Sequence, residues 1–163
     1  SIGVVSIPFA AYGYWGIMTR LDEVQFLSRI AFSFMIFGLV AVMIAATLNG
    51  LVLTQFVQSY AQASDEVIAS LKPIFAYNHV FNVANDYIYM SAVAVSTLCW
   101  SISILISRRL SSWLGYFGLL LVLIGVLSIV FGYIFTSVTG FSIFIFGSAA
   151  WTVAMGWSLR RSS

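Results

Sequence analysis

Residues 30–53 read IAFSFMIFGLVAVMIAATLNGLVL, an apolar run without a single charged side chain. About 20 mainly apolar residues are enough for a helix to cross the hydrocarbon core of a bilayer. The run is continuous rather than alternating and is too long for a strand. Because a backbone in lipid must satisfy its own hydrogen bonds, a helix is the expected conformation. This stretch therefore predicts a membrane-spanning helix.

Further stretches of the same kind bring the number of predicted spans to five. They are 2–18, 83–106, 114–135 and 141–159. The composition agrees, because 61% of the 163 residues are hydrophobic and 7% are charged. A soluble domain has roughly 25% charged residues. We therefore expect an all-α, polytopic membrane bundle that forms a single domain over residues 1–163.

The positive charges predict the orientation of this bundle, because cytoplasmic loops retain Lys and Arg. With the carboxyl terminus in the cytoplasm, only Lys72 lies on the outer side. We then expect an outer amino terminus and outer connections at 54–80 and 136–140. The inner side carries the arginines, namely Arg20, Arg29, Arg108, Arg109, Arg160 and Arg161.

The connection 54–80 is the only sizeable region predicted to lie outside the bilayer. Ser64 followed by two acids is typical of a helix start, with an N-cap and a negatively charged first turn. Val67, Ile68 and Leu71 then share one face. We expect a short amphipathic helix on the outer surface, acting either as a lid or as a gate or docking surface.

The first span, 2–18, has no positively charged flank and no cleavage site of small residues. It therefore does not have the pattern of a signal peptide. We interpret it either as a complete helix or as the remainder of a longer segment.

Small residues recur every seven positions in the last two predicted spans. This spacing keeps them on one seam of a left-handed helix pair, where they let the backbones approach closely. We interpret the seam as packing between antiparallel neighbours, with self-association as the alternative. Its members are Gly118, Gly125, Gly132, Gly140, Gly147 and Ala154.

A polar cluster at the head of the third predicted span is the most informative feature for function. At 100° per residue most of its members share about one third of the helix circumference. A polar stripe on a spanning helix should face the protein interior or a wet cavity. Asn49, in the second span, has the same predicted depth. The candidate ligand-binding residues are Asn49, Asn78, His79, Asn82, Asn85, Asp86, Tyr89 and Ser96.

Three interpretations of this cluster stay open. It caps the helix and specifies packing, binds a small polar molecule or lipid headgroup, or forms an enzymatic centre in which Asp86 supports proton transfer by His79. No catalytic residue can be assigned from a motif. One His, one Cys and one nearby Asp do not supply the three or four ligands of a zinc site. Without a phosphate loop or dinucleotide fingerprint, we expect no metal and no cofactor.

The second half of the chain carries several short motifs. They are Asn78-His79-x2-Asn82, Leu98-Cys99-Trp100-Ser101, Ser107 to Gly115, Val138-Thr139-Gly140-Phe141 and Trp151 to Gly156. On these motifs, over roughly residues 78–160, the chain resembles small uncharacterised bacterial polytopic inner-membrane proteins. The resemblance implies a multi-pass protein of the bacterial inner (plasma) membrane and brings no activity with it.

The functional expectation is an integral membrane protein that binds a small molecule or lipid headgroup in an outward-facing polar pocket. The alternative is an accessory or structural subunit of a larger membrane complex, and the third possibility is an intramembrane enzyme. The expected partners are the lipid bilayer and either such a ligand or such a complex. Nucleic acid is excluded because the chain has no basic patch.

Overall fold

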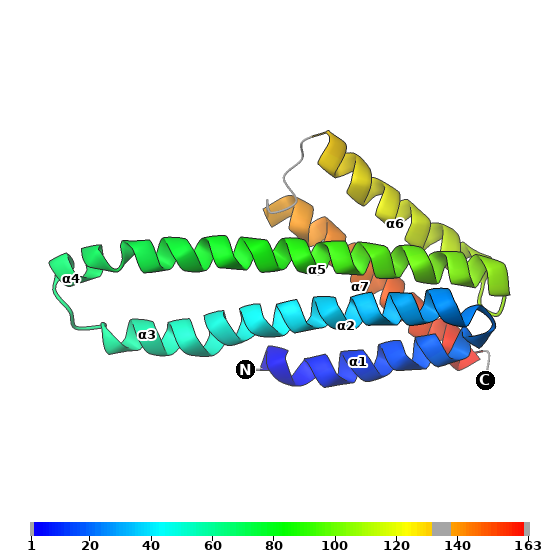
Figure 1. The fold of residues 1–163 in the computed structure, drawn as a ribbon, viewed down its shortest axis with the longest axis horizontal. Helices are drawn as coiled ribbons and strands as arrows, with labels where there is room; N and C mark the ends of the chain where they lie inside the picture. The colour runs from blue at the N-terminus through cyan, green and yellow to red at the C-terminus, as the bar shows by residue number, and fades with distance from the viewer. Residues whose placement is uncertain (1, 132–137, 162–163) are drawn as a thin grey trace.

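A computed structural model describes residues 2–131 and 138–161, and every regular element in these ranges is a helix (Figure 1). The all-α prediction is therefore confirmed for the described residues. In chain order the elements are α1 (Ile2–Arg20), the 3-10 turn η1 (Asp22–Val24), α2 (Gln25–Thr47), the π-helical turn η2 (Leu48–Val52), α3 (Leu53–Ser59), α4 (Asp65–Ser70), α5 (Lys72–Ser107), α6 (Ser112–Val130) and α7 (Val138–Arg161).

Two antiparallel helical rods, side by side, give the molecule its longest dimension (Figure 1). In the first rod α2, η2 and α3 continue into one another from Gln25 to Ser59 over 35 residues. The second rod is α5, with 36 residues. At 1.5 Å per residue each rod is roughly 50 Å long, whereas the hydrocarbon core of a bilayer is about 30 Å thick. We refer to the two rods and their link, residues 25–107, as the hairpin.

Residues 54–80 are predicted to form an outer connection, but in the structure both rods continue into this stretch. The first rod ends at Ser59 and the second begins at Lys72, so the link between them contains only α4. A helix does begin at Asp65 after an extended Ser64, as expected, but the Ser64 side chain makes no capping hydrogen bond. The polar residues of this stretch do not favour lipid, but they can still form a helix where a second helix packs beside them. The predicted short helix is thus α4, at the tip of the hairpin. Its place on an outer membrane surface stays a prediction.

Three helices in the described part of the chain are long and apolar enough to cross a membrane, namely Gln25–Ser59, Lys72–Ser107 and Ser142–Arg160. They contain the predicted spans 30–53 and 83–106 and nearly all of 141–159. α1 and α6 coincide with the remaining predicted spans, 2–18 and 114–135, although the end of the latter lies outside the described ranges. These helices indicate contact with lipid and a multi-pass arrangement. The number of five spans stays a prediction.

The other helices pack along one half of the hairpin, and the half that carries α3 and α4 projects alone (Figure 1). α1 lies against α2, and α6 lies against α5. α7 contacts both α6 and α1, so it closes the bundle.

The arginines gather at one end of this bundle because successive helices run in opposite directions (Figure 1). Arg20 ends α1, Arg29 lies near the start of α2, Arg108 follows α5 and Arg160 lies near the end of α7. Lys72 lies at the opposite tip of the hairpin. We call the former the arginine end. The named arginines and Lys72 thus lie at opposite ends of the molecule, and the orientation of these ends relative to a membrane stays a prediction.

A buried tryptophan links three helices near the arginine end. Trp100 of α5 is 0% exposed and stacks on Tyr14 of α1, with 5.4 Å between the ring centroids. Its Nε1 donates to Ser28 Oγ of α2 at 3.3 Å, and Ser28 Oγ donates to the Met18 carbonyl oxygen of α1. Because these bonds satisfy the buried polar atoms, the indole fills the core without a desolvation penalty.

Two glycines of the predicted seam, Gly118 and Gly147, lie where helices come close together. A Cβ added at Gly118 of α6 would collide with Ser101 Oγ of α5 and lie 2.9 Å from Trp151 Nε1 of α7. One added at Gly147 of α7 would lie 2.8 Å from Leu121 Cδ2 of α6. The seam therefore involves α5 as well as the α6–α7 pair.

The remaining seam residues are placed in less detail. Gly125 is buried in α6, and Ala154 is half-buried against the core. Gly140 lies in the first turn of α7, and Gly132 is outside the described residues.

Candidate functional site

A pocket of about 260 Å³ opens between α2, α5 and the amino-terminal part of α7. Polar side chains from the two rods and apolar ones from α2 and α7 share its wall. Its lining residues are Ala41, Val42, Ala45, Ala46, Asn49, Asn85, Asp86, Tyr89 and Ile145. Half of the predicted ligand-binding residues are thus brought together around one pocket, namely Asn49, Asn85, Asp86 and Tyr89.

Small side chains of α2 leave this space open. Ala41 and Ala45 are four residues apart, so both lie on the same face of the helix. One turn earlier the rods are in close contact, because a Cβ added at Gly38 would lie only 3.1 Å from Ala92 Cβ of α5. The rods therefore touch at Gly38, and the alanines that follow are too short to fill the gap.

Beside the pocket, three asparagines tie the two rods together. Asn49 Nδ2 donates to Asn82 Oδ1, and Asn82 Nδ2 donates back to Asn49 Oδ1, each at 2.9 Å. Asn78 Nδ2 also donates to Asn49 Oδ1, at 3.1 Å. These amides are engaged with one another, which favours the packing interpretation for Asn78 and Asn82.

An irregular turn presents Asn49 to α5. Residues 48–52 form the π-helical turn η2 inside the first rod. Such turns are rare in proteins overall, and those that occur are often found at functional sites. The Thr54 hydroxyl donates to the Asn49 carbonyl oxygen at 3.2 Å, which adds a side-chain contact to this turn. The dipeptide Asn49-Gly50, a common breaker of regular structure, is the sequence signal that could have predicted this turn.

Asp86 differs from the asparagines because its carboxylate has no partner among the described residues. It is half-buried and lines the pocket, and no hydrogen bond or ion pair joins it to another described side chain. Its neighbour Asn85 is 7% exposed and donates Nδ2 to the Phe81 carbonyl oxygen at 2.9 Å, which leaves the amide oxygen available. Tyr89, one turn further along α5, adds a half-buried ring. The pocket therefore combines a carboxylate, an amide oxygen and an aromatic ring.

His79 and Ser96 lie apart from the pocket. His79 is exposed, and no hydrogen bond or ion pair links it to Asp86. Ser96 is 0% exposed and donates its hydroxyl to the Ala31 carbonyl oxygen at 2.7 Å, so it holds α5 against α2. The predicted stripe is thus divided between a pocket, an asparagine cluster and a packing contact.

The described ranges contain no cluster of side chains that could serve as metal ligands. No group of three or more His, Cys, Asp or Glu side chains lies close enough there to hold an ion. Cys99 is a free, half-buried thiol of α5 and does not line the pocket.

The sequence patterns do not identify the apolar residues that line the pocket. Ile145 comes from α7, which is distant in the chain, and no periodicity on α7 alone relates it to α2. Ala41 and Ala45 carry a partial signal, since two small residues four positions apart are typical of contacts between membrane helices.

Comparisons with protein family models, with curated proteins and with solved structures find no significant match to the chain. The resemblance to bacterial inner-membrane proteins therefore stays a prediction, and function has to be inferred from the pocket.

Proposed function

We propose that the chain is a multi-pass membrane protein that binds a small molecule with a positively charged group in the pocket beside Asp86. The observation that supports this is the Asp86 carboxylate, half-buried in the pocket wall with no partner among the described residues. An ionisable residue on an apolar spanning helix is costly, and such residues usually pair or mark a ligand or ion path.

The remaining groups of the pocket suit an amine or a substituted ammonium ion. A carboxylate only accepts hydrogen bonds, and the free amide oxygen of Asn85 is a second acceptor. The ring of Tyr89 adds a face that attracts cations. A volume of about 260 Å³ lies just below that of sites for drug-sized molecules. The ligand class is therefore a small amine, or the amine-bearing headgroup of a lipid.

The proposed orientation of the protein in the membrane follows from the distribution of its positive charges. Five spans with the arginine end in the cytoplasm place the projecting half of the hairpin on the outer side. The asparagine cluster and the pocket then lie in the outer half of the protein. The resemblance of residues 78–160 supports the bacterial inner membrane as the location.

The proposal is tested by native mass spectrometry of the protein purified in a mild detergent. The variant Asp86→Asn keeps the shape of the side chain and removes its charge, and Glu66→Gln is the matched control at the hairpin tip. We expect a bound small molecule on the wild type and on Glu66→Gln, and its loss from Asp86→Asn. A wild type without bound mass, or an equal bound mass on Asp86→Asn, would contradict the proposal.

A second candidate function, that of a subunit in a larger membrane complex, is favoured by the apolar surface of the projecting half. Tyr77 and Val80 of α5 are 72% and 66% exposed, and Val57 of α3 is 47% exposed. The same purification separates the two candidates. A stoichiometric protein partner that is lost when Tyr77 and Val80 are replaced with serine would support the subunit.

A further inference from the structure

At the arginine end, Arg29 lies on a polar ridge between two surface grooves. Gln25, Arg29 and Ser33 are four residues apart on α2 and line both grooves. Arg29 Nη2 donates to Gln25 Oε1 at 3.1 Å, and the Ser33 hydroxyl donates to the Arg29 carbonyl oxygen at 2.9 Å. These contacts hold the ridge together along one stripe of the helix.

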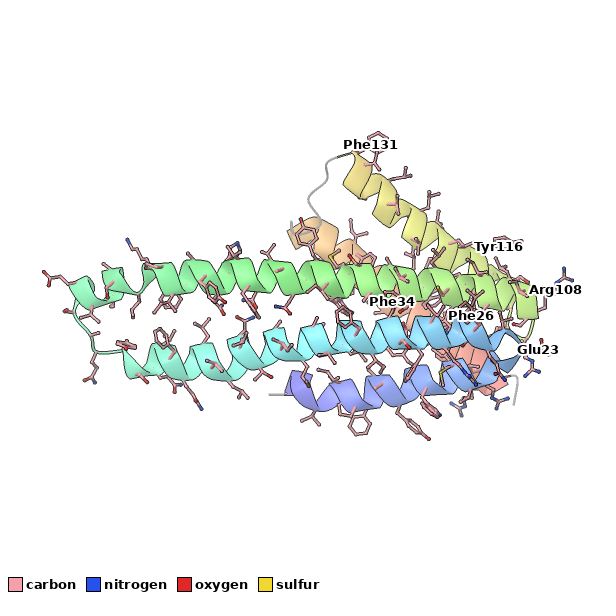
Figure 2. All side chains as sticks on the ribbon, in the orientation of Figure 1. Glu23, Phe26, Phe34, Arg108, Tyr116 and Phe131 are labelled. Carbon is pink, nitrogen blue, oxygen red and sulfur yellow. The ribbon has the colours of Figure 1, made fainter. Side chains whose placement is uncertain are left out.

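The grooves on the two sides of the ridge are large and mostly apolar. One has a volume of about 450 Å³ and is walled by Phe26, Ile30 and Phe34 of α2. Figure 2 labels Phe26 and Phe34, which are 76% and 42% exposed, along this side of the helix.

The other groove has a volume of about 560 Å³ and runs between α1 and α2. Trp15, Met18 and Thr19 of α1 and Phe32 of α2 form its walls. Trp15 is 52% exposed, and its ring meets the edge of Phe32 at a centroid distance of 5.8 Å.

No carboxylate in the described part of the chain neutralises the charge of Arg29. Its partner Gln25 is uncharged, and no described carboxylate pairs with it. Arg109, at the same end, differs in this respect because it forms an ion pair with Glu23 at 2.7 Å. Arg29 therefore offers a guanidinium without a described counter-ion, and such a group binds phosphate through two parallel hydrogen bonds.

We infer that this ridge and its two grooves bind one anionic phospholipid, with the phosphate on Arg29 and one acyl chain in each groove. An unpaired cation between two apolar channels matches the charge and the two-chained shape of such a lipid. Aromatic side chains such as Trp15 are favoured at the headgroup level, and basic pockets between helices on the cytoplasmic side are typical sites for anionic headgroups. The site lies on α1 and α2 and is separate from the pocket beside Asp86.

The test is native mass spectrometry of the protein released from vesicles of equimolar phosphatidylglycerol and phosphatidylcholine. We expect the wild type to retain phosphatidylglycerol in clear excess over phosphatidylcholine. In Arg29→Gln the excess should fall to parity, whereas Arg108→Gln, which removes an exposed charge at the same end, should keep it. An excess that survives in Arg29→Gln, or an equal loss in both variants, would overturn the inference.

A second variant tests the grooves without changing the charge. Ser33 is exposed and lines both grooves, so Ser33→Phe should obstruct them and lower the retained phosphatidylglycerol. Ser59→Phe, at the far end of the first rod, is the control and should keep the wild-type excess. Unchanged retention in Ser33→Phe would overturn the two-groove site. Displacement of the lipid by inorganic phosphate would overturn it as well, because it would show a simple anion site.

The same assay distinguishes the lipid site from the proposed ligand pocket beside Asp86. Asp86→Asn should retain the phosphatidylglycerol excess, because the carboxylate belongs to neither groove. Loss of the excess in Asp86→Asn would contradict the separation of the two sites.

Discussion

At the scale of single residues, Gly118 is a position where no side chain fits. The helix α6 meets α5 and α7 there, with Ser101 Oγ on one side and the Trp151 indole on the other. The indole has little freedom to move, because it is 1% exposed and its Nε1 donates to the Leu114 carbonyl oxygen at 2.9 Å. An added methyl group must therefore displace a helix or break that bond.

Replacing Gly118 with alanine should lower the free energy of unfolding by about 1–3 kcal/mol, the usual cost of overpacking a core. Gly156→Ala is the matched control on α7, where a Cβ would meet nothing within 4 Å. That change should be neutral or should stabilise the helix by up to about 1 kcal/mol. Thermal unfolding in detergent measures both, and equal melting temperatures for the two variants would contradict the packing described for Gly118.

At the scale of the elements, the apolar runs predict where helices exist but not where they end. Hydropathy reports contact with lipid, and α5 continues through polar residues to Lys72 because the first rod runs beside it. Asn49 and Asn82 lie at the same level of the hairpin, since their side chains are hydrogen-bonded, whereas their depth in a membrane stays a prediction. The division of the predicted ligand-binding residues into a packed asparagine cluster and an open pocket could not be predicted. It depends on the register of α2 against α5 and on the π-helical turn η2.

The reciprocal bonds between Asn49 and Asn82 should couple the two rods energetically. Hydrogen bonds between membrane helices contribute about 0.6 kcal/mol on average and up to about 1.7 kcal/mol. A double-mutant cycle of Asn49→Ala and Asn82→Ala should give a stabilising coupling energy in this range, measured by unfolding in mixed micelles. Gln58→Ala paired with Asn82→Ala is the control, because Gln58 is an exposed residue of the first rod, and its cycle should give no coupling. A zero value for the asparagine pair would mean that its bonds do not hold the rods together.

At the scale of the whole molecule, the rods are longer than a bilayer is thick. Membrane helices tilt by about 0–40°, and a rod of roughly 50 Å still spans close to 40 Å at the upper limit. Part of the hairpin therefore extends beyond a hydrocarbon core of about 30 Å. Because α1, α6 and α7 cover only the half at the arginine end, the projecting half with α3 and α4 is the part expected in water (Figure 1).

The central claim is that the chain crosses the membrane with the arginine end in the cytoplasm and the hairpin tip outside. Labelling of single cysteines in intact cells with a membrane-impermeant maleimide tests it most directly, in a background in which Cys99 is replaced with alanine. Ser64 at the hairpin tip and Ser111 between α5 and α6 are both exposed, so either position accepts a probe. We expect a cysteine at 64 to react in intact cells and one at 111 to react only after the membrane is opened. Reaction at 111 in intact cells, or protection at 64, would contradict the claim.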